Sequence, residues 1–283
     1  MRLSVKALLG LVAALTLFVA VVVSAQRDAH PNSLTVRFLN VGQGDAAFIE
    51  TPGGRQILID GGPNRAVLRE LGGLMPWWDR TIDMIIATHP DADHVSGLVD
   101  VLDRYAVTYI IEPGVEHDTP QAESMLRAVA NEGAEHVLAR RGDIYDFGDG
   151  VSLEILFPDR DTSGWETNTA SIVARLVYGS TSFLFTGDSP ESVERYLVGL
   201  EGSALQSTVL KAGHHGSRTS SSLLFVGAVA PTYAVYSRGC DNEYGHPHQE
   251  VVDTFSRFDV DQYDTCKEGT VTFVSDGRVV YRE

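Results

Sequence analysis

Several short apolar runs in the chain are each followed directly by a cluster of aspartate, glycine or histidine. Functional groups of α/β proteins gather just beyond the carboxyl ends of strands. Several clusters in this one orientation therefore predict a site along one edge of a sheet. The clusters are Asp60-Gly61-Gly62, His89 to His94, Thr186-Gly187-Asp188, Lys211 to Ser217, and Tyr244-Gly245-His246-Pro247.

Strand and helix signals alternate along the rest of the chain, which predicts a mixed α/β layered sandwich. Gly-rich turns at 42–44 and 52–54 separate the first strands. The strands are expected at 34–38, 46–50, 56–59, 84–88, 108–111, 152–156, 171–177, 182–185, 207–210, 232–236 and 270–274. The helices are expected from Pro63 to Gly73 and at about 94–104, 121–131, 190–200, 221–229 and 250–258.

The first 25 residues read as a secretory signal peptide or a single N-terminal membrane anchor. Arg2 and Lys6 precede an apolar run from Ala7 to Val23. Val23-Ser24-Ala25 fits cleavage before Gln26, whereas the run is long enough for an anchor. On either interpretation this segment contacts the membrane, and the rest is exported, either secreted or held at the outer face of the cytoplasmic membrane. Residues 26–33 form a spacer, and 34–283 are predicted to be one domain.

The formal net charge is −16, and an acidic surface repels nucleic acid unless bound cations or a local basic groove offset it. The charge thus counts against a nucleic-acid substrate without excluding one. Cys240 and Cys266 lie in the part expected to be exported, where a disulfide is permitted. Two buried free thiols are the alternative.

The stretch Thr88-His89-Pro90-Asp91-Ala92-Asp93-His94 places two imidazoles and two carboxylates in one loop between a strand and a helix. Such side chains suit zinc, manganese or iron. Asp91 and Asp93 could instead cap the helix that follows. The other strand-end clusters favour the metal.

Seven motifs in order resemble the metallo-β-lactamase superfamily, and within it the C-terminal hydrolase domain of the competence protein ComEC. The resemblance covers nearly everything after Ser33 and implies an αββα sandwich, two central mixed sheets flanked by helices, with two metal ions at one edge. The motifs are Phe38 to Ala46, Asp60-Gly61-Gly62, His89-x-Asp91-x-Asp93-His94, Thr167 to Ser171, Thr186-Gly187-Asp188, Lys211-x-x-His214-His215-Gly216-Ser217, and Asn242-x-Tyr244-Gly245-His246-Pro247.

Asp91 stands where most of the superfamily has a second histidine, as in the ComEC-like branch, and Asn168 stands where many members have another. The carboxylate shifts the preference between zinc and manganese toward manganese. By this resemblance one metal is assigned to His89, Asp91 and His214, and the other to Asp93, His94 and His246, with Asp188 bridging. His214 is preferred to His215 as the ligand.

The resemblance implies a hydrolase that uses hydroxide from a metal-bound water. The expected catalytic residues are Asp93, Asp188, Lys211 and His215. Asp60 is expected to orient a ligand histidine. Lys211 is expected either to pair with a substrate phosphate or carboxylate, or to be a solvated charge at a strand end. Asn168, Ser171 and Ser217 are expected to donate hydrogen bonds to substrate or to close turns.

The preferred function is an exported metal-dependent phosphodiesterase or nuclease that acts on DNA. The first alternative is hydrolysis of a small phosphoester of the phosphorylcholine type, a lactone or a β-lactam. The second is a binding module that has kept the fold without catalysis. No protein partner can be inferred from the sequence.

Overall fold

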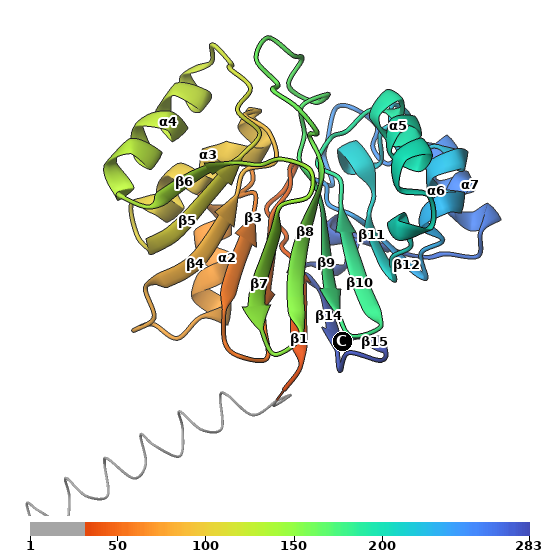
Figure 1. The fold of residues 1–283 in the computed structure, drawn as a ribbon, viewed down its shortest axis with the longest axis horizontal. Coiled ribbons are helices and arrows are strands. Elements are labelled where there is room, and N and C mark those ends of the chain that lie inside the picture. The colour runs from red at the N-terminus through yellow and green to blue at the C-terminus, as the bar shows by residue number, and fades with distance from the viewer. Residues whose placement is uncertain (1–31) are drawn as a thin grey trace, which may run out of the picture.

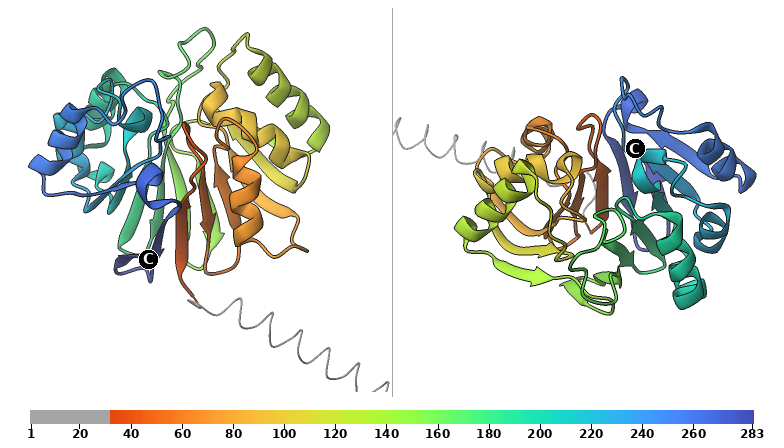
Figure 2. Two further views of the ribbon diagram at one scale, coloured as in Figure 1. Left: turned by 180° about the vertical axis from the view of Figure 1, so that it is seen from behind. Right: turned by 90° about the horizontal axis from the view of Figure 1, so that it is seen from above.

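Two β-sheets pack face to face in the middle of the molecule, and helices cover the outer face of each sheet (Figures 1 and 2). The computed structural model describes residues 32–283, so the predicted N-terminal segment lies outside the described residues. The αββα sandwich predicted from the sequence is confirmed.

The first sheet has eight strands. In spatial order they are β15 (Val280–Arg282), β14 (Val271–Ser275), β1 (Leu34–Phe38), β2 (Ala47–Glu50), β3 (Gln56–Ile59), β4 (Thr81–Ile86), β5 (Ala106–Glu112) and β6 (Glu135–Leu138). The second sheet has seven. These are β13 (Asp261–Asp264), β12 (Tyr233–Tyr236), β11 (Val209–Lys211), β10 (Thr181–Phe185), β9 (Val173–Tyr178), β8 (Val151–Phe157) and β7 (Ile144–Gly148).

Three helices pack on the outside of each sheet (Figure 2). The first sheet carries α2 (Ala66–Leu74), α3 (Ala92–Leu102) and α4 (Pro120–Glu132). The second carries α5 (Glu191–Glu201), α6 (Leu223–Val229) and α7 (Gln249–Arg257). The short elements are α8 (Thr265–Glu268), η1 (Gly202–Leu205) and η2 (Gly213–Gly216).

The core lies in three apolar layers, one between the sheets and one under each set of helices. Between the sheets, the rings of Phe38, Phe183 and Phe273 are fully buried and pack on one another. Burial of such rings is the dominant favourable contribution to folding. Within residues 32–283, no helix is both long and apolar enough to cross a membrane.

The strands that the sequence analysis missed are β6, β7, β13 and β15, which are the outermost strands of the two sheets. Outermost strands have one open edge and are partly exposed, as the alternately exposed side chains of β7 show. They therefore need no long apolar run, and their polar sequences resemble loops. The inner strands were expected, although β4 begins at Thr81 rather than at Met84.

The direction of the strands fixes where the loops meet. Strands β3 to β6 run parallel to one another, as do β10 to β13. Strand β1 is antiparallel to β2, which is antiparallel to β3, so β1 also runs with β3. The carboxyl ends of the parallel strands in both sheets therefore open onto one edge of the sandwich. The chain enters the fold at the opposite edge, the lower end in Figure 1.

Candidate metal centre

Loops from both halves of the molecule bring the predicted ligands to this common edge. His89, Asp91, Asp93 and His94 follow β4, whereas Asp188 follows β10. His214 and His215 follow β11, and His246 follows β12. The His94 ring lies 4.0 Å from the His89 ring and 5.3 Å from the His215 ring, between ring centres. The His246 ring lies 5.7 Å from that of His214. The predicted residues thus form one cluster.

The loop after β4 is set largely by the start of α3. The carbonyl of Asp91 accepts hydrogen bonds from the backbone N–H groups of His94 and Val95. The Asp91 side chain makes no capping bond, so its carboxylate can face the site. Gly97 lets the helix approach closely, because a Cβ there would lie 2.0 Å from the carbonyl oxygen of Gly61. Asp91 therefore stands at the N-cap position of α3, and Asp93 in its first turn, but the Asp91 side chain does not cap the helix.

Asp60 holds both histidines of this loop through hydrogen bonds. Its Oδ2 accepts from Nδ1 of His94 at 2.9 Å and from the Thr88 hydroxyl at 2.8 Å. Because that hydroxyl donates to Asp60, it accepts from Nδ1 of His89 at 3.0 Å. In the neutral form of each ring the proton then sits on Nδ1, and Nε2 keeps the lone pair that a metal ligand requires.

Asp188 lies at the point where the two halves meet. Its Oδ1 is 3.4 Å from Nε2 of His94. Its Oδ2 is 3.4 Å from Nε2 of His215 and 3.5 Å from Nε2 of His214. The Asp188 carboxylate is almost fully buried. One oxygen of the Asp188 carboxylate therefore lies near His94 of the first half, and the other lies near His214 and His215 of the second half.

His214 and His215 are both held in the left-handed region of backbone conformation, with φ of 48° and 55°. For residues other than glycine this costs about 1–3 kcal/mol each and persists only where the surrounding structure enforces it. His215 is buried, with Nε2 3.2 Å from Asp93 Oδ2. His214 is more open, and its Nδ1 bonds to the hydroxyl of Thr219. Both imidazoles reach Asp188, so the preference for His214 stays a prediction.

Sequence reasoning missed the role of Asp45, which lies in the turn between β1 and β2. Asp45, His94, Asp188 and His215 each offer a ligand atom, and these atoms lie within 4.8 Å of one another. Asp45 Oδ1 lies 3.1 Å from Nδ1 of His215, and this Nδ1 bonds to the Ser237 carbonyl. Two signals could have found Asp45: it is an acid in a Gly-rich turn after a strand, although no histidine lies nearby, and it belongs to the motif Phe38 to Ala46.

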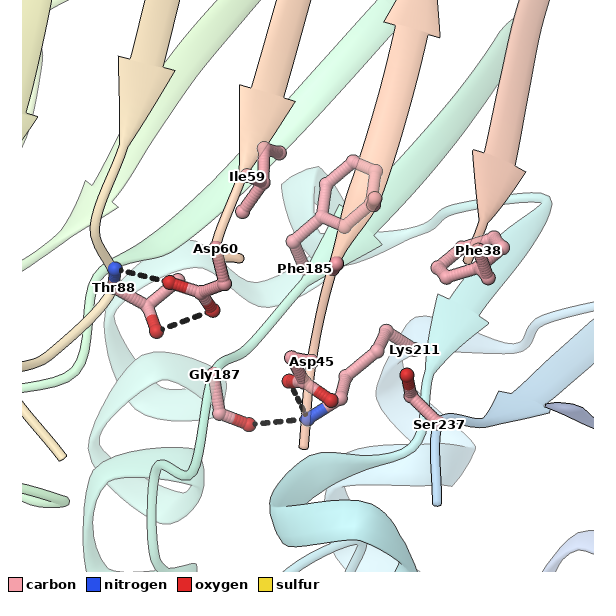
Figure 3. A pocket seen from close by; sticks show the side chains of 11 residues that line it. Phe38, Asp45, Ile59, Asp60, Thr88, Phe185, Gly187, Lys211 and Ser237 are labelled. Carbon is pink, nitrogen blue, oxygen red and sulfur yellow. Dashed lines mark hydrogen bonds and ion pairs between the residues drawn. The ribbon is translucent and has the colours of Figure 1, made fainter. Parts of the chain in front are cut away.

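The Lys211 side chain extends toward Asp45 and Gly187 in a buried pocket (Figure 3). Its ammonium pairs with Asp45, donates to the Gly187 carbonyl at 2.9 Å and lies 3.5 Å from Asp188. The side chain is buried. Lys211 is therefore not a solvated charge at the strand end, and the ammonium is not directed toward a substrate at the open side. It neutralises the carboxylates beneath the site.

The loop that carries His246 is tied to the fold by a disulfide and by an asparagine. Cys240 and Cys266 are disulfide-bonded, so of the two alternatives for the cysteines the structure shows the bond. The Asn242 side chain accepts from the backbone N–H of His246 and donates to its carbonyl. The ring of Tyr244 stacks on the imidazole of His246, 5.5 Å away between centres, and is 65% exposed.

The serines expected to bind substrate or close turns support the ligand loops, and Ser217 does close a turn, because its hydroxyl accepts from the backbone N–H of Thr219. The Ser171 hydroxyl accepts from the backbone N–H of Asp188 at 3.2 Å. The Ser217 hydroxyl accepts from Thr219, which bonds to His214. Asn168 belongs to a turn, and its Oδ1 is buried without a hydrogen-bond partner in the described chain.

A histidine outside the predicted set also reaches this edge. His117, in the loop after β5, places Nδ1 3.4 Å from Oδ1 of Asp91. Like the predicted ligands, it follows a parallel strand, and this position was the signal that could have found it. In the part of the chain that the structure describes, neither of these two atoms has a hydrogen-bond partner, so His117 is a further imidazole beside the candidate ligands.

Burial and neighbouring charges shift the pKa values of the residues in the cluster. Burial opposes protonation of His94 and His215, but the carboxylates around them outweigh it and raise the pKa of both imidazoles well above the ordinary value. Burial lowers the pKa of His89, and burial and the neighbouring histidines lower the pKa of His246 to about 4. Burial alone would raise the pKa of Asp45, but Lys211 and His215 lower it to about 2.

The donor set fits divalent metal ions. Within residues 32–283, His89 Nε2, His94 Nε2, His246 Nδ1 and Asp91 Oδ1 are buried and have no hydrogen-bond partner. Buried polar atoms are nearly always partnered, so such atoms converging at one edge indicate a missing partner. Imidazole nitrogen combined with carboxylate oxygen suits zinc or manganese.

Comparisons with known proteins agree with this geometry. The family model described as "Metallo-beta-lactamase superfamily" matches residues 39–239. The chain is 27% identical over 266 residues to ComE operon protein 3 of Bacillus subtilis, covering 86% of this chain and 33% of that protein. It is 35% identical over 248 residues to competence protein ComA of Neisseria gonorrhoeae, with 86% and 33% covered. The chain thus spans about a third of the length of these relatives.

A solved structure shows the same fold. The metallo-beta-lactamase fold protein YhfI from Bacillus subtilis superposes with a TM-score of 0.57 at 13% identity, covering 86% of this chain and all of that one. The family match extends over most of the chain and includes the loops after β4, β10 and β11 that build the candidate centre. The chain therefore belongs to the metallo-β-lactamase superfamily.

Proposed function

We propose that this protein is an exported metal-dependent phosphodiesterase that cleaves DNA. The observation that carries the proposal is the convergence of imidazoles and carboxylates from both halves on Asp188, with buried ring nitrogens left without partners. Hydrolysis of a phosphodiester needs positive charge beside the phosphoryl oxygens and an activated water, and such a cluster can hold the cations that supply both.

The residues that would hold two ions are those of the sequence assignment. His89, Asp91 and His214 would hold one ion, and Asp93, His94 and His246 the other, with Asp188 shared between them. His215 and Asp45 lie close enough to His94 and Asp188 to share an ion with them. Bound zinc or manganese would lower the pKa of a water nucleophile and stabilise the charge that develops on the phosphate.

The protein's own groups prepare the site for that reaction. Asp60 holds Nδ1 of His94 directly and that of His89 through Thr88, which would leave Nε2 of each ring for a metal ion. Lys211 balances Asp45 and Asp188 from below, which keeps both carboxylates ionised in a buried place. Preorganised charge of this kind needs no rearrangement when the substrate reacts.

Two features support DNA as the substrate. DNA is the substrate class that the resemblance to ComEC suggests, and the relative from Neisseria gonorrhoeae is named competence protein ComA. The exposed Tyr244 ring beside His246 offers a surface on which a nucleobase can stack. The net charge of −16 opposes DNA binding, so affinity should depend on the bound cations.

Two features support export. Arg2 and Lys6 before the apolar run have the pattern of a secretory signal or anchor. The Cys240–Cys266 disulfide belongs to oxidising compartments rather than to the cytosol.

The test is cleavage of single- and double-stranded DNA by the purified protein with Mn²⁺ or Zn²⁺, after removal of all metal with a chelator. We expect cleavage that returns only when metal is added. The variant Asp93→Ala, Asp188→Ala should lose at least about 10³-fold in rate, because it removes ligands for both ions. The control Asp103→Ala changes an exposed carboxylate just beyond the far end of α3 and should match the unmodified protein.

Equal cleavage by the double variant would contradict the proposal, since the activity would then come from a contaminant or another site. Cleavage of a chromogenic phosphodiester without cleavage of DNA would instead identify a small phosphoester as the substrate. Binding of less than one metal ion per chain would favour a binding module without catalysis.

A further inference from the structure

Two tryptophans stand out from the surface on the connection between α2 and β4. The Trp77 side chain is 78% exposed and that of Trp78 is 50% exposed. Their rings contact each other edge to face, with centres 5.6 Å apart, and neither belongs to the apolar layers of the core. Tryptophan is a large amphipathic side chain that is enriched where a protein meets the water–lipid interface.

The strand directions place this pair at the edge where the chain enters the fold. Strands β1 and β4 run in the same direction, so the connection before Thr81 lies at the same edge as Leu34. The Asp79 side chain confirms this, because it accepts a hydrogen bond from Gln56 at the start of β3. In Figure 1 and in the left view of Figure 2 this connection and the start of β1 both lie at the lower end. The candidate metal centre lies at the opposite edge.

The distances allow the Trp pair and the N-terminal apolar run to meet one flat membrane surface. From β1 to β4 there are three strand spacings, about 14 Å. The eight residues from Gln26 to Ser33 can span up to about 27 Å. An apolar run seated in a bilayer could therefore leave the Trp pair against the same surface.

Arginines beside the Trp pair also favour contact with a membrane surface. Arg80 follows Trp78 by two residues, and its guanidinium lies over the ring of Tyr105, 5.6 Å from the ring centre. The backbone carbonyl of Arg80 accepts from Ala106 N, which places Arg104 nearby. Long cationic side chains reach toward lipid phosphates while their stems cover apolar surface. The neighbouring carboxylates already accept hydrogen bonds: Asp79 accepts from Gln56 and Thr81, and Asp83 accepts from Arg55.

We propose that Trp77 and Trp78 insert into the headgroup region of the bilayer that the N-terminal apolar run enters. The proposal rests on the prediction that this run is a membrane anchor, and it is independent of the reaction catalysed. Two contacts fix the orientation of the domain, whereas a single tether leaves it free to turn. The metal centre then faces away from the lipid.

The experiment uses the full-length chain in vesicles of phosphatidylcholine and phosphatidylglycerol, with either ordinary or brominated acyl chains. Bromine quenches tryptophan emission only at close range. The chain has three tryptophans, and Trp165 packs on Phe157 in the second half. The variant Trp165→Phe therefore reports on the pair alone. We expect brominated lipid to remove at least half of its emission, with stronger quenching by bromines near the headgroups.

The matched control is Trp77→Ser, Trp78→Ser, which keeps Trp165 and should show no quenching while still floating with the vesicles. Because both side chains are exposed, this variant should fold like the unmodified protein, as circular dichroism can show.

Flotation without quenching in Trp165→Phe would overturn the proposal. Emission shifted to shorter wavelength equally in both lipids, and dependent on protein concentration, would overturn it in favour of contact between two copies of the chain. Loss of flotation in the full-length chain would show that the anchor prediction itself had failed.

Discussion

The two halves of the molecule contribute to the candidate centre in different ways. The first half supplies His89, Asp91, Asp93 and His94 from one loop, held by the start of α3 and by Asp60. The second half supplies Asp188, His214, His215 and His246 from three separate loops. These loops depend on left-handed backbone at the histidine pair, on Asn242 and on a disulfide.

The position of a ligand is thus set by local contacts along the chain in the first half and by tertiary packing in the second half. In the first half, neighbouring residues along the chain already determine which side chains converge. In the second half, each ligand is placed by a different strand end, and its position depends on the packing of the whole sheet. Variants of the buried groups under each half can therefore test whether the halves respond as differently as they are built.

The largest effect is expected for Lys211→Met, which removes the cation between Asp45 and Asp188. Both carboxylates would stay buried without it, and breaking such a pair costs about 3–5 kcal/mol. We expect a loss of this size in the free energy of unfolding by urea in chelator. Added Mn²⁺ should restore part of it, because the ion replaces the lost charge. An unchanged midpoint in chelator would show that Lys211 does not stabilise the second half.

A smaller effect is expected from Glu194, a buried carboxylate on α5 that accepts from the backbone of Ser221 and Ser222. Burial raises the pKa of Glu194 from 4.5 to about 7, against those hydrogen bonds. The folded chain then holds the proton over a pH range where the unfolded chain has lost it. Stability should fall by about 3 kcal/mol as the pH rises from about 4.5 to 7.

In Glu194→Gln the contribution of this group should vanish, so the difference in unfolding free energy between the two proteins should change across that range. Parallel stability curves for the two proteins would show that Glu194 titrates normally. Glu194 supports the Ser221 turn next to the histidine pair, since the Ser221 hydroxyl accepts from Gly213 N. A pH-dependent difference in unfolding free energy would strengthen the contrast between the ligand loops of the second half and the loop of the first half.

The smallest effect is expected for Asp60→Asn in the first half. The new amide would donate to Nδ1 of His94 and move the ring proton to Nε2, where it blocks the lone pair. Groups that orient a metal ligand in this way are worth about 10- to 100-fold in affinity. Calorimetric titration with Mn²⁺ or Zn²⁺ should show that loss. Asp83→Asn is the control, because Asp83 lies at the far end of β4. Equal affinity in Asp60→Asn would mean that the loop is held without Asp60.

The sequence predicted the inner strands, the layered fold and the cluster of residues at one edge, because apolar runs and the polar residues after them depend only on local order. It did not predict the contact between Asp45 and His215 or the inward direction of Lys211. Those depend on how a turn of the first sheet meets a strand end of the second. The choice between His214 and His215 was open for the same reason, since adjacent residues share every sequence signal and differ only in backbone direction.

The distance along the chain between the two sets of ligands also decides when the centre can form. A chain is made from its N-terminus, so the loop with His89 and His94 exists long before β12 and the His246 loop that follows it. No binding set that joins both halves is complete until the last third of the chain has folded. Affinity alone selects poorly among divalent metals, and supply decides which one binds. The ion in this protein would therefore be the one available where folding ends, and not where synthesis begins.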